Sequence, residues 1–144
     1  MTRVDFYILQ QNGREARMRF ACRLVEKARK HGNHLFIAVQ NEAEAKELDS
    51  LLWHHAPESF LPHTIFTPEN DEAISAPTMI AYGDDCGDHH DILINLREDI
   101  PDFFSRFQRL AEIVVQDAEV LDRTRANWKY YRDRGYPLQR HAIR

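Results

Sequence analysis

Short apolar segments that alternate with helix-forming segments constrain the fold of this chain more than any other feature. Residues 4–9 (VDFYIL) and 34–39 (HLFIAV) have the composition of strands that are buried on both faces. Between them, residues 15–30 place apolar side chains at spacings of three and four, which predicts an amphipathic helix. Because strands separated by helices are usually joined by crossover connections, we expect a mostly parallel sheet flanked by helices.

The same alternation continues to the end of the chain. Further strands are expected at residues 64–66, 78–82, 91–96 and 112–115. Asn41 is expected to cap a helix that runs through Trp53, and further helices are expected at residues 101–110 and 118–134. The sequence contains no internal repeat, low-complexity tract or linker, so residues 1–144 are expected to form one α/β domain.

Composition excludes a membrane-spanning or secreted chain. The mean hydropathy is -0.58, and no apolar run approaches the roughly 18 residues that a membrane span needs. The first residues carry Arg3 and Asp5 before any apolar stretch, unlike a signal peptide. Cys22 and Cys86 are isolated thiols, which suits a reducing compartment. We therefore expect a cytoplasmic protein.

The glycines of the chain do not form a phosphate-binding motif. None of the five stands in the spacing of a P-loop or of a dinucleotide-binding loop, and no nucleophile elbow (GxSxG) is present. No carboxylate is marked by its sequence surroundings as a general acid or base. We therefore expect neither a cofactor nor catalytic residues.

Residues 84–91 (DDCGDHHD) are the strongest indication in the sequence of a catalytic function. Aspartate, cysteine and histidine all bind zinc, so this loop could belong to a metal-dependent hydrolase. However, neighbouring side chains rarely converge on one ion, and no second ligand pair stands at a standard spacing. The sequence favours a solvated polar loop over a metal site.

Charge is distributed unevenly along the chain. The net charge is -4, but residues 121–144 carry +5 and the first 120 residues carry -9. An acidic body repels the nucleic-acid backbone, whereas a basic end attracts anions. The predicted last helix is therefore the place where an anionic ligand is expected.

Four residues of that helix recur at spacings of four, three and four: Leu121, Arg125, Trp128 and Arg132. They share one helix face, and Val114 is expected near the start of the helix. Guanidinium groups beside an indole suit an acidic peptide that ends in a hydrophobic residue and a free carboxylate. Two alternatives remain: stacking of single-stranded bases on Trp128, and packing of the apolar side chains into the core.

Residues 51–63 (LLWHHAPESFLPH) predict a second surface. A helix that ends near Trp53 runs into a proline-stiffened loop with Phe60 and Pro62. If these three side chains are exposed together, they form a rigid aromatic anchor for a protein partner. The alternative is that Trp53 and Phe60 fill the core of the domain itself.

The chain resembles the chi subunits of bacterial DNA polymerase III in five collinear segments. These are residues 6–9 (FYIL), 48–53 (LDSLLW), 58–63 (ESFLPH), 91–96 (DILINL) and 131–136 (YRDRGY). Together they span nearly the whole chain, and the tryptophan followed by ESFLPH is the most specific of them. The resemblance implies an α/β domain similar to nucleotide-binding, helicase-like folds but without their phosphate loop, which agrees with the missing glycine motifs. It also implies a non-enzymatic adaptor within the polymerase holoenzyme.

The resemblance also implies two partners and assigns them to the two surfaces. A psi-facing surface, which leads to the clamp loader, would include Trp53, Phe60 and Pro62. A second surface would bind the acidic C-terminal tail of single-stranded DNA-binding protein through Val114, Arg125 and Trp128, with Arg132 as a further cation on the same helix face. Contact with nucleic acid would then be indirect. Leu121 stands where the family has a lysine, which implies a weaker or altered tail site.

Overall fold

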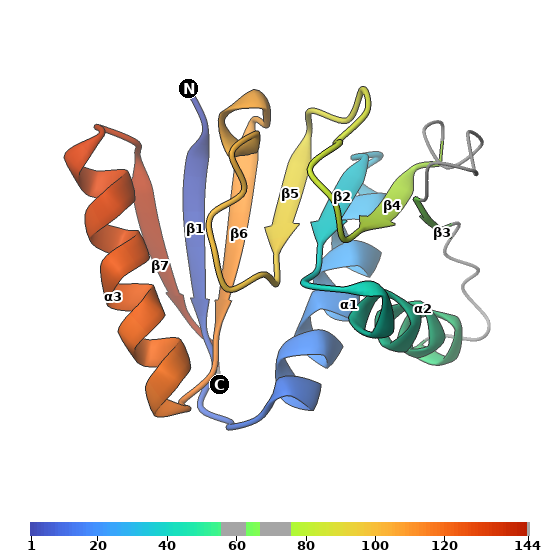
Figure 1. Cartoon of the computed structure of the whole chain (residues 1–144), viewed down its shortest axis with the longest axis horizontal. Coiled ribbons are helices and arrows are strands. Elements are labelled where there is room, and N and C mark those ends of the chain that lie inside the picture. The colour runs from blue at the N-terminus through green and yellow to red at the C-terminus, as the bar shows by residue number, and fades with distance from the viewer. Residues whose placement is uncertain (56–62, 67–75, 144) are drawn as a thin grey trace.

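The computed structural model describes residues 1–55, 63–66 and 76–143. In chain order its elements are β1 (Arg3–Ile8), α1 (Arg14–Lys30), β2 (Leu35–Ala38), α2 (Glu42–His55), β3 (Thr64–Ile65), β4 (Thr78–Ala81), β5 (Ile92–Asn95), the 3₁₀ helix η2 (Phe104–Arg106), β6 (Arg109–Val114), α3 (Ala118–Asp133) and β7 (Leu138–Ala142). Figure 1 shows these elements as one layered α/β domain. The expected fold class is confirmed.

The strands of the described residues form one sheet in the order β3-β4-β2-β5-β6-β1-β7, and every pair is parallel. Parallel neighbours need long crossovers, which explains why each central strand is followed by a helix or a long loop. The α1 crossover connects β1 to β2 across β6 and β5, and the α3 crossover connects β6 to β7 across β1.

Helices cover the two faces of the sheet separately. Helices α1 and α2 share a core with alternate residues of the strands, such as Ile37 and Ile113. On the other face, α3 and the segment around η2 pack against Phe6, Phe36 and Val114. Because the sheet is buried from both sides, its central strands read as continuous apolar runs, as the sequence predicted.

The helix expected at residues 101–110 is wrong. Only one turn, η2, forms there, and Phe107 is already extended with φ -95° and ψ 150°. Leu110 instead lies in β6, which begins at Arg109, three residues before the strand expected at residue 112. The spacing of Phe103, Phe104 and Phe107 imitated a helix face because all three insert into the same core.

The strand β7 was not expected from the sequence. It pairs with β1 over five residues, beginning with Leu138 opposite Val4. Its residues, LQRHA, are partly or fully exposed, so they lack the apolar run that revealed the other strands. The chain reaches β7 through Gly135, whose φ of +82° ends α3 and reverses the chain.

Candidate functional site

The row of side chains on α3 divides into a buried part and an exposed part. Trp128 and Leu121 are partly buried against the core under α3, and the rings of Trp128 and Phe6 lie 5.0 Å apart. Arg125 and Arg132 flank them, with 73% and 60% of their side chains exposed. The apolar side chains of the row therefore pack inward, as one alternative from the sequence proposed, and its two arginines remain exposed on the same helix.

Arg125 and Arg132 each have only a weak ionic partner within the described residues. The Nη1 atom of Arg125 donates to Oδ1 of Asp122 at 2.8 Å, one turn earlier on the same helix. The Nη2 atom of Arg132 lies 3.4 Å from Oδ1 of Asp133, its neighbour in sequence. Exposed pairs of this kind contribute about 0–1 kcal/mol each, so an external carboxylate can displace them.

Val114 does not lie at the start of the helix. It is the last residue of β6, four residues before α3 begins, and it is 1% exposed. It belongs to the same core as Leu121 and Trp128, so it supports this face from behind rather than lying on it.

Arg123 belongs to a different side of α3. Its Nη1 atom lies 3.7 Å from Oε1 of Glu98, in the loop after β5. Arg123 is thus engaged across the molecule, and Arg132 is the cation of the two that is more available to a ligand.

Trp53 projects from the last turns of α2 and is 47% exposed. Among the described residues, the only other large hydrophobic side chain with comparable exposure is that of Met1. The Trp53 ring lies 4.6 Å from the ring of His63, which is itself buried and 3.0 Å from Oδ1 of Asp49. These contacts hold one face of the indole and leave part of it open to solvent.

Phe60 and Pro62 lie outside the described residues. The expectation that they share a surface with Trp53 therefore stays a prediction. Because His63 follows them directly and contacts Trp53, the chain does return to the indole after this segment.

The polar loop at residues 84–91 does not gather its possible ligands. Asp84 pairs with Arg97 at 3.0 Å, and Asp85 accepts a hydrogen bond from the backbone of Gly87. His89 donates to the carbonyl of Ala76, and its burial lowers its pKa from the ordinary value. Across residues 1–55, 63–66 and 76–143, no group of three or more His, Cys, Asp or Glu is placed to hold a metal ion. The geometry thus gives the hydrolase alternative no support.

The N-terminus of α1, where phosphate loops bind anions in related topologies, is occupied by protein groups. The backbone N–H of Gly13 donates to the carboxylate of Asp117. Arg17, one turn into the helix, donates to the carbonyls of Asn95, Leu96 and Ile113, at the carboxyl ends of β5 and β6. Burial lowers the pKa of Arg17 from its ordinary value. These bonds join α1 to the carboxyl ends of β5 and β6.

A buried polar network beneath α3 was missed by sequence reasoning. Glu112 of β6 accepts hydrogen bonds from Asn95 of β5 at 2.7 Å and from Asn127 of α3 at 3.1 Å. Burial raises the pKa of this carboxyl group from its ordinary value. The only sequence signal was an acidic residue at the head of an apolar run, and this signal does not distinguish a buried carboxylate from an exposed one.

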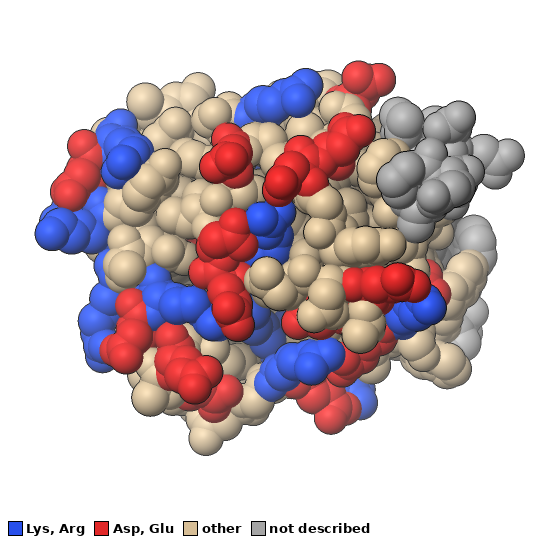
Figure 2. All heavy atoms as spheres, viewed as in Figure 1, with Lys and Arg blue, Asp and Glu red and all other residues tan. Residues whose placement is uncertain are grey.

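Basic side chains gather where α3 lies. Figure 2 shows Lys and Arg along the side of the molecule formed by α3, with some acids among them, and more Asp and Glu over the centre of the same face. This distribution agrees with the +5 charge of residues 121–144. In the part of the chain that is described, no helix is long and apolar enough to cross a membrane.

Comparison with known proteins gives one consistent family. The family described as DNA polymerase III chi subunit, HolC, matches residues 1–139. A DNA polymerase III subunit chi from Pseudomonas aeruginosa is 39% identical over 143 residues, which are 99% of this chain and 98% of that protein. The subunit chi of Haemophilus influenzae is 32% identical, over 93% of this chain and 92% of its own length. That of Escherichia coli is 29% identical, over 96% of each.

A solved structure shares the fold at low sequence identity. The structure of T4 UvsW superposes with a TM-score of 0.72 and 8% identity, covering 99% of this chain. The chain spans 41% of the length of UvsW. At this identity the likeness concerns the fold alone, and it agrees with the helicase-like fold that the family resemblance implies.

Proposed function

The chain belongs to the DNA polymerase III chi subunit family, and from this premise we propose that it is a non-catalytic, cytoplasmic adaptor of DNA replication. One surface binds the psi subunit of the clamp-loader complex, and another binds the acidic C-terminal tail of single-stranded DNA-binding protein. Membership of the family supports a role as a subunit of a DNA replication complex. The identity of the two partners, and the surfaces that bind them, are proposed in addition.

The observation that carries the tail assignment is the row formed by Arg125, Trp128 and Arg132 on α3. Two exposed guanidinium groups flank an indole whose position is held by Phe6. A hydrophobic side chain of the tail can lie against Trp128 while the terminal carboxylate binds Arg125 in a bidentate pair. Arg132, one turn further on, attracts the acidic residues that precede the terminus.

The acidic body of the protein supports a protein tail over direct binding of single-stranded DNA. A strand of DNA extends beyond one helix and would meet the -9 charge of the first 120 residues. Trp128 is also partly buried, which leaves less of its ring for stacking a base than a fully exposed platform offers. A short peptide needs only the basic face of α3.

The exposed indole of Trp53 supports the psi assignment. A tryptophan that is 47% exposed and is held by neighbouring rings loses little conformational freedom when a partner buries it. The contribution of Phe60 and Pro62 to this surface is part of the same proposal.

The two surfaces lie far enough apart in the fold to be used together. Helix α2 packs near β3 and β4 at one edge of the sheet, whereas α3 packs near β6 and β7 at the other. Figure 1 shows α2 and α3 at opposite ends of the molecule. An adaptor that bridges two partners requires this separation.

Titration with a peptide of the tail sequence, followed by calorimetry, tests the tail site. We expect Arg125→Ala to weaken binding by about 2–4 kcal/mol. Amidation of the peptide's terminal carboxylate should lower its affinity for the unchanged protein by a comparable amount. Asp122→Asn releases Arg125 from its helix partner and should tighten binding by about 0.3–0.5 kcal/mol.

Arg134→Ala provides the matched control. Arg134 is also a cation near the end of α3, but its side chain lies over the ring of Tyr130 at 3.6 Å. We expect this substitution to change the affinity only slightly. Equal binding of the free-acid and amidated peptides would rule out the role of Arg125.

A further inference from the structure

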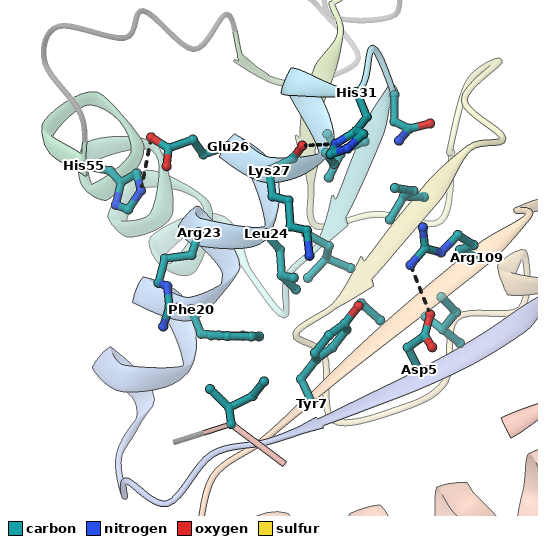
Figure 3. A pocket seen from close by; sticks show the side chains of 18 residues that line it. Asp5, Tyr7, Phe20, Arg23, Leu24, Glu26, Lys27, His31, His55 and Arg109 are labelled. Carbon is teal, nitrogen blue, oxygen red and sulfur yellow. Dashed lines mark hydrogen bonds and ion pairs between the residues drawn. The ribbon is translucent and has the colours of Figure 1, made fainter. Parts of the chain in front are cut away.

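A cavity lies on the face of the sheet opposite α3. It occupies about 770 Å³ between the C-terminal half of α1 and the strands β5, β6 and β1. Figure 3 shows side chains of α1 and of the sheet pointing into this space. Neither Trp53 nor the Arg125–Trp128 face borders it, so the proposed adaptor function leaves it unexplained.

The floor and inner wall of the cavity are apolar and partly aromatic. Figure 3 shows Tyr7 of β1 and Phe20 and Leu24 of α1 pointing into the space, and Ala111 of β6 also lines it. The rings of Tyr7 and Phe20 lie 5.5 Å apart, and the ring of His141 stacks on Tyr7 at 4.8 Å. The volume is within the range of roughly 300–1,000 Å³ that is typical of small-molecule sites.

The acidic side chains that border the cavity both have partners on the protein. The buried carboxylate of Asp5 has Arg3, Arg109 and His141 within 3.5 Å. Glu26 lies 3.8 Å from Nε2 of His55, at the end of the cavity away from Asp5. The two arginines therefore offset the charge of Asp5, and Glu26 lies away from the middle of the cavity.

Two cations at the rim have no acidic partner among the described residues. Arg23 contacts only the ring of Phe20, at 5.3 Å from its centroid, and Lys27 points into the space beside Leu24. Both side chains are exposed and can turn toward a ligand. The Tyr7 hydroxyl, whose pKa is raised by burial and by Asp5, stays protonated and can also donate a hydrogen bond.

We propose that this cavity binds a small aromatic anion, a flat ring system that carries one carboxylate or sulfonate group. The rings would lie against the apolar surface that Tyr7, Phe20 and Leu24 form together, where they bury apolar area. The anionic group would face Lys27 and Arg23, which supply the charge that the cavity leaves unpaired.

Two probes that differ by one charge test the proposal. 8-Anilinonaphthalene-1-sulfonate carries a sulfonate, and N-phenyl-1-naphthylamine has the same rings without it. We expect fluorescence titration of the full chain to show the sulfonate binding about three- to tenfold more tightly than the neutral probe. Equal affinities, or tighter binding of the neutral probe, would overturn the proposal.

Matched lysine variants locate the anion. Lys27→Gln should weaken sulfonate binding by about two- to fivefold and leave the neutral probe unchanged. Lys30→Gln removes the same charge from the same helix, outside the cavity, and should change neither. If the two variants weaken sulfonate binding equally, the effect is one of general charge and the site is refuted.

A variant that fills the cavity locates the rings. Ala28 borders the cavity from α1, and Ala28→Trp should reduce binding of both probes at least about fivefold. Circular dichroism verifies that this variant is folded. Unchanged binding by the folded variant would place the probes elsewhere on the surface and contradict the proposal. If the variant does not fold, the comparison of Lys27→Gln with Lys30→Gln still tests the site.

Discussion

Glu112 shows how a single residue couples the sheet to α3. Its two carboxylate oxygens accept from Asn95 and Asn127, and the charge of Arg17 also favours its charged form. Burial nevertheless dominates and raises its pKa above the ordinary value. A buried carboxyl group of this kind holds α3 in position through directional bonds that an apolar residue could not make.

This network makes the stability of the domain depend on pH. Because the pKa of Glu112 is higher in the folded chain than in the unfolded one, its favourable contribution is complete below the unfolded value and is lost as pH rises through the folded value. We expect the free energy of unfolding, relative to Glu112→Gln, to fall as pH rises above about 4.5, the ordinary pKa of a glutamate. The fall should be about 1.4 kcal/mol for each unit by which burial raises the pKa.

Urea unfolding at several pH values measures this difference. Glu119→Gln, on the exposed first turn of α3, is the matched control and should show no such trend relative to the unchanged protein. A difference between the Glu112→Gln variant and the unchanged protein that stays constant with pH would show that Glu112 does not resist ionisation in the fold.

Individual surface residues could be predicted where spacing alone decides their position. The intervals between Arg125, Trp128 and Arg132 predicted a common helix face, because helix geometry is local. The sequence left open whether Trp128 is exposed or packs into the core, because its partial burial depends on Phe6, which is more than a hundred residues away in sequence. Glu112 was missed for the same reason: its partners belong to β5 and α3.

At the scale of elements, the predictions succeeded where local signals and burial agree. The strands with continuous apolar runs and all three α-helices were expected within a few residues. The helix at residues 101–110 failed because aromatic residues with helical spacing also suit one turn followed by a strand. The strand β7 was missed because its place at the sheet edge leaves it polar.

The N-terminus of α2 is an element-level signal that can be tested directly. The side chain of Asn41 accepts from the N–H of Glu44 at 2.9 Å, and the Glu44 carboxylate accepts from the N–H of Gln40. This closely matches the capping arrangement predicted from the sequence. We expect Asn41→Ala to lower the free energy of unfolding by about 1 kcal/mol, as measured by chemical denaturation.

Asn41→Ser is the matched control for the cap. Serine keeps an oxygen that can accept from the same N–H, so most of the stability should return. If alanine and serine destabilise α2 equally, the side-chain hydrogen bond contributes nothing, and the helix that presents Trp53 is held by packing alone.

At the scale of the whole molecule, the net charge of -4 averages two regions of opposite sign. In the proposed function, the acidic body disfavours contact with bare DNA and the basic face of α3 attracts an acidic peptide. Helix α2, which carries Trp53, lies at the other end of the molecule from α3, so salt screens it from the charge of α3. The proposed adaptor thus uses chemically different surfaces for its two partners.

The most direct test of this adaptor role measures both partners at once. The protein is mixed with the psi subunit and single-stranded DNA-binding protein, and the complexes are resolved by size-exclusion chromatography with light scattering. We predict a three-component complex with the unchanged protein. Arg125→Ala should lose only the DNA-binding protein, and Trp53→Ala should lose only psi. A variant that releases both partners, or two variants that release neither, would contradict two separate docking surfaces.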